Sequence, residues 1–375
     1  MKTQKASITP LQFMFSITCF LRSSSLLSSF FAPISKTDSW LVVLIASVVC
    51  LPFLWAFIML MKAFPGKNLI EINDAVFGRI AGKIISAIYL WFFLTLTSLN
   101  LRDLGGFVGK SIMLKTPQIV IITVFILLCA WAVSLGLDIV TRYSVVFVIL
   151  SSIILVVTIA ATSNHMRLSN FLPILRQPMK NIIQSTNIVS TIPFGELVIF
   201  LMIMPQVNIK PKKLGRYFLP GFFLGAFLIT LVVARDIAIL GNTITIFAQP
   251  SFETLRMVSF FEVLTHMEIL FAILLIILFF FKISLLFYVS MLAMSYLFRL
   301  DSYKPLILPS AAIIVVYSLI IFKSKTKHLE VGRETAPFMW FIFEFLLPLL
   351  TLIIAYIRKL PQKEKDARSK EAASA

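Results

Sequence analysis

The sequence predicts an all-α integral membrane protein of ten transmembrane helices, arranged as two inverted repeats of five, in which helices 1 and 6 are discontinuous. Of the 375 residues, 59% are hydrophobic and 14% are charged, and the mean hydropathy is +0.96. This composition excludes an ordinary soluble globule. Ten apolar runs have about the 20 residues that a spanning helix needs. Two of these runs are interrupted by polar residues at matching positions.

The ten runs lie roughly at residues 11–32, 40–61, 84–101, 117–135, 143–162, 182–205, 217–240, 267–297, 306–322 and 337–357. Strands of a transmembrane barrel would be about ten residues long and alternate in polarity, so a barrel is excluded. Five spans in each half give the halves opposite topologies, as in many secondary transporters. We therefore predict one transmembrane domain over residues 1–360, with repeats at about 11–162 and 182–357, and a polar cytoplasmic tail at 361–375.

The two interrupted spans indicate a ligand site. The interruptions are Arg22-Ser23-Ser24-Ser25 and Pro193-Phe194-Gly195-Glu196, each beginning 11 residues into its span. Pro193 lacks a backbone donor and Gly195 permits non-helical geometry, so both leave carbonyl and N–H groups free. Unwound backbone inside a membrane is tolerated where it lines a cavity or binds a ligand. A proline kink without a ligand, and an intact helix 1 with serines bonded to the preceding turn, remain alternatives.

Charged residues inside the spans indicate the same region. Arg22, Glu196, Lys282 and Glu344 lie within spans 1, 6, 8 and 10, and their charges sum to zero. A charge in the membrane interior is costly unless it is paired or faces water. We therefore expect pairing among them, either as static salt bridges or on a ligand pathway.

The formal net charge of +17 does not indicate nucleic-acid binding, because most basic residues fall in short loops between spans. Loops on the side of the N-terminus hold 19 Lys and Arg residues and the opposite side holds 13. The positive-inside rule then places both termini in the cytoplasm. The expected partners are membrane lipid and a small molecule.

Cofactor and enzyme motifs are not visible. The three cysteines and three histidines show no metal-ligand spacing, so neither a zinc site nor a disulfide is expected. A membrane-embedded enzyme also lacks a recognisable catalytic arrangement. The outer connections 163–181 and 241–263 mix polar and apolar residues at helical spacing and are predicted to form short amphipathic helices.

Several blocks resemble the spore-germination permease family, the B subunits of germinant receptors, within the amino acid–polyamine–organocation transporter superfamily. The similarity runs from about residue 8 to residue 360. The blocks are ITPLQ (8–12), FPGKNLIEI (64–72), LNLRDLGGFV (99–108), RLSNFLPIL (167–175), PFGELVIFLMIMPQV (193–207) and FFKISLLFY (280–288).

This resemblance implies a leucine-transporter-like fold and a nutrient germinant sensor in the inner membrane of a spore. Family members sense small germinants, mostly amino acids, and act with an integral-membrane A subunit and a lipoprotein C subunit. Carried over by position, the site comprises Arg22, Ser23, Ser24, Ser25, Thr95, Leu99, Phe194, Gly195, Glu196, Phe200, Lys282 and Ser284. The family commonly has a glycine-containing break in span 1, whereas Arg22 supplies a cation here, which favours an acidic or polyhydroxyl germinant. The alternative function is a secondary transporter of amino acids or related small solutes.

Overall fold

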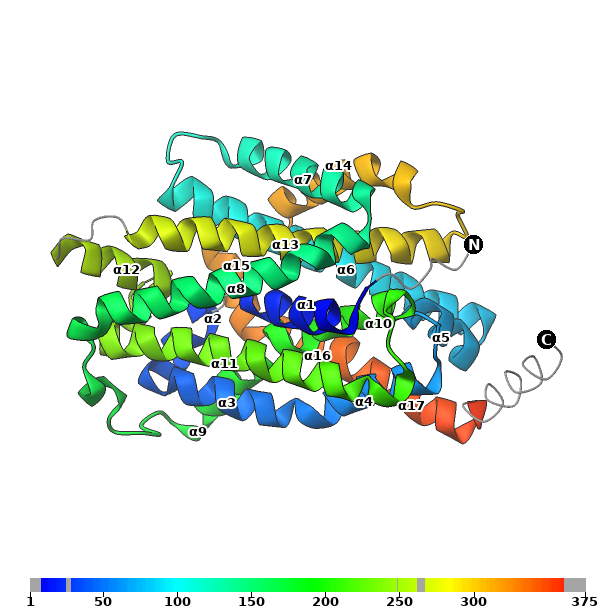
Figure 1. Ribbon diagram of the computed structural model, residues 1–375, viewed down its shortest axis with the longest axis horizontal. Coiled ribbons are helices and arrows are strands. Elements are labelled where there is room, and N and C mark those ends of the chain that lie inside the picture. Colours follow the sequence, from blue (N-terminus) through cyan, green and yellow to red (C-terminus); the bar gives the residue numbers. More distant parts are fainter. Residues whose placement is uncertain (1–7, 25–27, 248, 262–266, 361–375) are drawn as a thin grey trace.

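The computed structural model describes residues 8–24, 28–247, 249–261 and 267–360, and these residues are almost entirely helical. The α-helices are α1 (Pro10–Arg22), α2 (Ser28–Ser35), α3 (Ser39–Val49), α4 (Leu51–Ala63), α5 (Leu69–Phe77), α6 (Arg79–Ser111), α7 (Gln118–Leu135), α8 (Leu137–Thr162), α9 (Met179–Val189), α10 (Phe200–Ile203), α11 (Gly215–Leu240), α12 (Pro250–Phe261), α13 (Met267–Leu297), α14 (Ile307–Ile320), α15 (Lys325–Glu334), α16 (Ala336–Phe341) and α17 (Leu347–Ile357). They form one elongated bundle, with α12 at one end and α5 and α17 at the other (Figure 1).

Eight helical stretches of the described chain are long and apolar enough to cross a membrane. The pair formed by α14 and α15 makes a ninth if it is counted as one span, with a bend of 92°. Span 1 does not pass as a continuous helix, because α1 has 13 residues and ends at Arg22. The architecture is the predicted multi-pass helical membrane fold, whereas the number ten stays a prediction.

The first predicted span, residues 11–32, is discontinuous at the predicted position and is divided into α1 and α2. Thr9 caps α1 through a reciprocal capping box with Gln12, and Pro10 occupies the first turn, where a missing N–H costs nothing. The helix ends at Arg22, and a new helix, α2, begins at Ser28. The predicted site residue Ser25 lies outside the described residues.

The sixth predicted span, residues 182–205, is also discontinuous at the predicted position. We call this interruption, between α9 and α10, the helix 6 break. After α9 the chain makes a π-helical turn over Ser190–Phe194, in which Ile192 leaves helical geometry with φ −119° and ψ 101°. The Ile192–Pro193 peptide bond is cis. A 3₁₀ turn over Gly195–Ile199 then leads into α10. Nearly every residue of this stretch is buried, so the break lies inside the protein and not at its lipid-facing surface.

Small residues let α11 approach α1 closely. A Cβ on Gly221 would lie 2.6 Å from the carbonyl oxygen of Met14, and one on Gly225 would lie 2.9 Å from Cβ of Leu21. Thr18 donates a hydrogen bond to the Gly221 carbonyl across the same contact, at 3.0 Å. Close approach through small residues is characteristic of helix packing in membranes. It keeps α1 in the centre of the bundle, where α8 and α13 also pack against it.

The connections differ in part from the sequence-based expectation. The amphipathic helix expected in 241–263 is present as α12. The one expected in 163–181 is wrong: the chain forms 3₁₀ turns at Ser163–His165 and Leu168–Phe171 and then an irregular stretch that contains Pro173 and Pro178. Helices α5 and α15, which lie between predicted spans, were not expected. The predicted tail at 361–375 lies outside the described residues.

Candidate functional site

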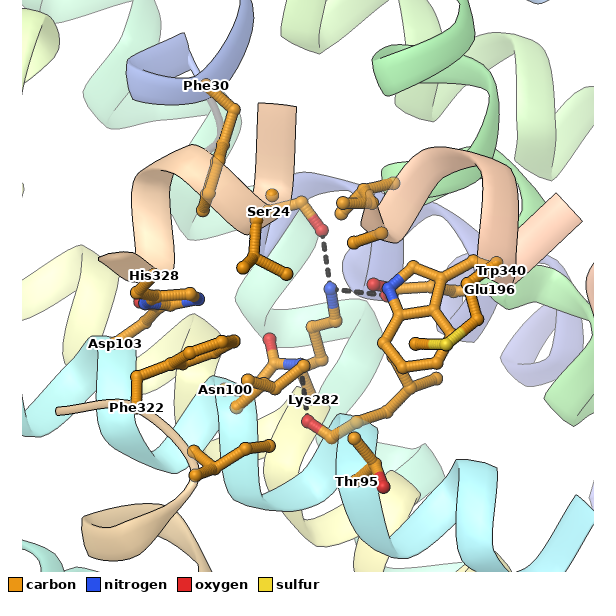
Figure 2. Close-up of a pocket in the computed structure, with 18 of the residues that line it drawn as sticks. Ser24, Phe30, Thr95, Asn100, Asp103, Glu196, Lys282, Phe322, His328 and Trp340 are labelled. Atoms are coloured by element: carbon orange, nitrogen blue, oxygen red, sulfur yellow. Dashed lines mark hydrogen bonds and ion pairs between the residues drawn. The ribbon is translucent and has the colours of Figure 1, made fainter. Parts of the chain in front are cut away.

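The two helix breaks converge on a lysine of α13. The Nζ of Lys282 lies 2.7 Å from Oε2 of Glu196, and it donates a hydrogen bond of 2.7 Å to Oγ of Ser24. The same ammonium lies 4.8 Å from the centroid of the Phe20 ring. The charged side chains of Lys282 and Glu196 are each 2% exposed. Lys282 therefore ties the end of α1 to the break in helix 6, and Figure 2 shows its ammonium between the two partners.

A cavity of about 240 Å³ opens beside this cluster. Five of the predicted site residues line it: Ser24, Thr95, Leu99, Glu196 and Lys282. Aromatic side chains form much of the remaining wall: Phe30, Trp91, Phe279, Tyr317, Phe322 and Trp340. The lining thus combines one pair of opposite charges with a largely apolar and aromatic surface, which is the usual composition of a small-molecule site.

Other predicted site residues lie near the cavity without lining it. Oγ of Ser23 donates to the carbonyl oxygens of Cys19 and Leu278, at 2.6 and 2.7 Å, and so fixes the end of α1 against α13. Phe194 packs against Phe222, with ring centroids 5.0 Å apart. Phe200 packs edge-on against the rings of Phe13 and Phe20. None of these three residues lines the cavity, and their contacts instead pack the two helix breaks against neighbouring helices.

Arg22, Gly195 and Ser284 are also placed outside the main cavity. Arg22 lines a separate cavity of about 20 Å³ together with Pro193. Its charge therefore does not enter the main cavity, and the expectation of an extra cation for the ligand has no geometric support. Gly195 faces Glu344, which lies in the π-helical turn Ile342–Leu346 between α16 and α17. Ser284 is fully buried.

Several lining residues were not predicted. Asn100, Asp103 and His328 complete the polar part of the wall, and the imidazole Nδ1 of His328 lies 3.4 Å from Oδ1 of Asp103. Asp103 lies at the end of an apolar run, where a charged residue is typical of the membrane interface and does not by itself indicate a ligand site. His328 belongs to α15, a helix that the sequence pattern did not predict.

A second cavity of about 140 Å³ adjoins the first, and both are lined by Phe30, Asp103 and His328. His328 stacks on Phe322 with ring centroids 4.7 Å apart, and it meets Phe30 edge-on at 5.6 Å. We call the three rings of Phe30, Phe322 and His328, together with Asp103 beside His328, the aromatic partition. The rest of the second cavity includes Arg102, Lys110 and Lys325. Figure 2 shows His328, Asp103 and Phe322 grouped together at one edge of the first cavity.

No metal centre is formed within the described residues, since they contain no group of three or more His, Cys, Asp or Glu side chains that could hold an ion.

Comparison with known proteins gives consistent matches. A family model described as "Spore germination protein" matches residues 7–327. Spore germination protein KB of Bacillus subtilis (strain 168) is 26% identical over 378 residues, covering 98% of this chain and 100% of that protein. Spore germination protein A2 of the same organism is 25% identical over 188 residues, covering 50% of this chain and 51% of that protein.

Solved structures of transporters have the same fold. MhsT in complex with L-phenylalanine matches with a TM-score of 0.66 at 10% identity, covering 94% of this chain and 99% of that chain. Mhp1, a nucleobase-cation-symport-1 family transporter, matches with a TM-score of 0.64 at 12% identity, covering 90% and 78%. At such identities the likeness shows the fold alone, which is the leucine-transporter-like one. Because the family model matches residues 7–327, which is most of its length, the chain belongs to the family of spore germination proteins.

Proposed function

We propose that this chain is the nutrient-sensing subunit of a spore germinant receptor and that it binds a small zwitterion, an amino acid, between Lys282 and Glu196. The observation that carries the proposal is the buried Lys282–Glu196 pair, joined to Ser24, at the wall of a cavity of about 240 Å³. Glu196 lies at the helix 6 break, and Lys282 of α13 contacts both Glu196 and Ser24, which follows the end of α1.

The charge pattern favours a ligand with both a carboxylate and an ammonium group. A ligand carboxylate that takes Lys282 and Ser24, while the ligand ammonium takes Glu196, opens the pair and leaves neither charge unpaired. Leaving one buried charge without its partner costs about 3–5 kcal/mol. A ligand that opens the pair but lacks one of the two groups incurs that cost, so the cluster selects for zwitterions.

The remainder of the cavity favours an apolar side chain. Trp91, Phe279 and Trp340 supply apolar surface next to the charged cluster. The cavity volume of about 240 Å³ suits a small solute, since pockets for drug-sized ligands occupy about 300–1,000 Å³. The polar groups Thr95 and Tyr317, whose oxygens are 3.2 Å apart, also line the cavity and can orient the ligand.

Binding at this place can change the conformation of the receptor. Lys282 holds the end of α1 and the helix 6 break together, so a ligand that replaces these contacts alters how the two breaks are held. A ligand shifts a conformational equilibrium only by its difference in affinity for the two states. A difference of about 100-fold corresponds to roughly 2.7 kcal/mol, which raises an active state from about 1% to about 50% of the population.

In this proposal the signal passes to an integral-membrane A subunit and a lipoprotein C subunit in the spore inner membrane. Its test uses spores that lack the gene, complemented with the wild-type chain, with Lys282→Met or with the control Lys327→Met. Lys327 belongs to an exposed ion pair with Glu330 on α15. Each standard L-amino acid is then supplied singly as germinant.

The wild type and Lys327→Met should restore germination by one amino acid or a small set of them, and Lys282→Met should not restore it although the protein is present in the membrane. Normal germination with Lys282→Met would contradict the proposal. Deletion of the genes for the A and C subunits should abolish the same response.

A secondary transporter is the alternative function, and the fold shared with MhsT and Mhp1 favours it. A transporter must complete an alternating-access cycle, whereas a sensor needs only two conformations. Purified protein in liposomes therefore distinguishes them. The sensor binds the amino acid without accumulating it, while saturable uptake by the isolated chain together with germination that is independent of partners would establish the transporter.

A further inference from the structure

Glu344 is a buried carboxyl group that the proposed ligand site does not use. It lies in the π-helical turn Ile342–Leu346 between α16 and α17, and its residue is 0% exposed. Neither of its carboxyl oxygens has a hydrogen-bond partner within the described part of the chain. It is also absent from the lining of the main cavity.

The carboxyl group of Glu344 packs against the helix 6 break. A Cβ on Gly195 would lie 2.7 Å from the carboxyl carbon of Glu344, so the absence of a side chain at Gly195 makes room for this group. Gly195 directly precedes Glu196 in the chain. The position of Glu344 is therefore coupled mechanically to the residue that pairs with Lys282.

Four other ionisable side chains interact electrostatically with Glu344: Glu196 of the helix 6 break, Lys282 of α13, Tyr89 of α6 and Cys50. Lys282 is the cation of this set, and its ammonium forms an ion pair with Glu196 at 2.7 Å. The other two groups donate to backbone carbonyls: Tyr89 to that of Phe343 at 3.0 Å, and Cys50 to that of Ser190 at 3.7 Å. The second buried carboxylate, Glu196, repels a negative charge on Glu344.

These surroundings disfavour the ionised form of Glu344. An isolated carboxylate in an apolar environment is so unfavourable that the group takes up a proton instead. A metal ion would require several further oxygen ligands, and the described residues offer no cluster of three or more acidic, His or Cys side chains. A proton removes the negative charge without any additional ligand.

We propose that Glu344 is a proton-binding site at the helix 6 break. In this conformation the proton is held on a carboxyl oxygen as a neutral acid. When the break moves away from the π-helical turn, water reaches the carboxyl group, the O–H bond breaks and the proton passes to water. Binding and release of this proton thereby depend on the conformation of the same segment that carries Glu196.

Infrared spectroscopy of the purified full-length chain in lipid nanodiscs tests the site without any nutrient ligand. A neutral carboxyl group gives a C=O stretching band, resolved from the amide bands, that shifts in D₂O. We expect the wild type at neutral pH to show this band, Glu344→Gln to lose the intensity of one carboxyl group, and Glu344→Asp to retain it at a shifted frequency. The matched control Glu330→Gln, which removes an exposed carboxylate, should keep the full band.

An unchanged band in Glu344→Gln, or its absence from the wild type, would overturn the proposal. If the wild-type band disappears when sodium chloride replaces choline chloride, the group holds sodium instead of a proton and the proposal is equally wrong. Should Glu344→Gln fail to fold, the frequency shift in Glu344→Asp decides the question. Failure here leaves the proposed ligand site untouched, because that site rests on Lys282, Glu196 and Ser24.

Discussion

Lys282 and Glu196 form an ion pair of 2.7 Å in which both side chains are 2% exposed. On α15 the pair Lys327–Glu330 has the same distance, but its side chains are 55% and 49% exposed. Solvent screening leaves an exposed pair worth about 0.2–1 kcal/mol, whereas breaking a buried one exposes an uncompensated charge to an apolar environment. The two pairs therefore form a matched test of what burial contributes.

The first prediction separates stability from ligand response. Lys282→Met and Glu196→Gln should each lower the thermal unfolding midpoint, because each single change leaves one buried polar partner uncompensated, at a cost of about 3–5 kcal/mol for an ionised one. The double variant should recover most of the stability while all three variants lose the nutrient response. Recovery of the response in the double variant would instead show a static salt bridge. Lys327→Met should change neither quantity.

The second prediction concerns the contact between Gly195 and Glu344. Gly195→Ala places a methyl group 2.7 Å from the Glu344 carboxyl carbon, so we expect a loss of about 1–3 kcal/mol from overpacking. Adding Glu344→Ala should recover part of that loss, since the two sites share one contact. The control Gly109→Ala, where the nearest atom is Ile121 Cδ1 at 3.6 Å, should be close to neutral. Equal effects of the two glycine substitutions on the unfolding midpoint would contradict the packing.

The third prediction concerns topology, which rests on the 19 to 13 distribution of basic residues. A membrane-impermeant thiol reagent applied to intact cells should modify Ser169→Cys and spare Lys212→Cys, until the membrane is permeabilised. The native cysteines Cys19, Cys50 and Cys129 are buried and should give little background. The reverse labelling pattern would invert the assigned orientation.

The fourth prediction concerns the aromatic partition. Phe30 lines both cavities, so Phe30→Ala should open a path between them. A thiol reagent should then modify Leu99→Cys in the main cavity severalfold faster than it does with Phe30 intact. Phe338, which is 69% exposed, provides a control substitution to Ala that should leave the rate unchanged. An unaltered rate in Phe30→Ala would show that Phe30 does not limit access.

Much of the fold could be predicted because its determinants are local in sequence. Apolar runs of spanning length identify most membrane helices. The two breaks can be recognised in the sequence because polar residues (Arg22 to Ser24) and a proline (in Pro193 to Glu196) interrupt an apolar run. The π-helical turn at Glu344 was not predicted. Pro348, four residues later, removes the donor that would bond the Glu344 carbonyl, but a proline in an apolar run gives no unique geometry.

The site could be predicted only in part, since an apolar span does not reveal which of its faces lines a cavity. Thr95 and Leu99, which the family resemblance indicated, line the cavity. Trp340 and Phe30 line it as well, but they carry no signal that distinguishes them from lipid-facing aromatics such as Trp55, which is 57% exposed. Asp103 and His328 meet from α6 and α15, across 225 positions of sequence separation by their numbering, and only tertiary packing brings them together. Arg22 was expected in the ligand cavity, but the end of α1 turns it toward Pro193 instead.

Direct binding of an amino acid to the purified chain in nanodiscs tests the zwitterion site most directly. The probe is the radiolabelled amino acid that triggers germination, and the competitors are its amide, which lacks the carboxylate, and its deaminated acid, which lacks the ammonium. We expect saturable binding by the wild type and by Glu330→Gln, at least tenfold weaker binding by Lys282→Met and Glu196→Gln, and poor competition by both analogues. Undiminished binding by either cavity variant, or full competition by either analogue, would contradict a ligand held between Lys282 and Glu196.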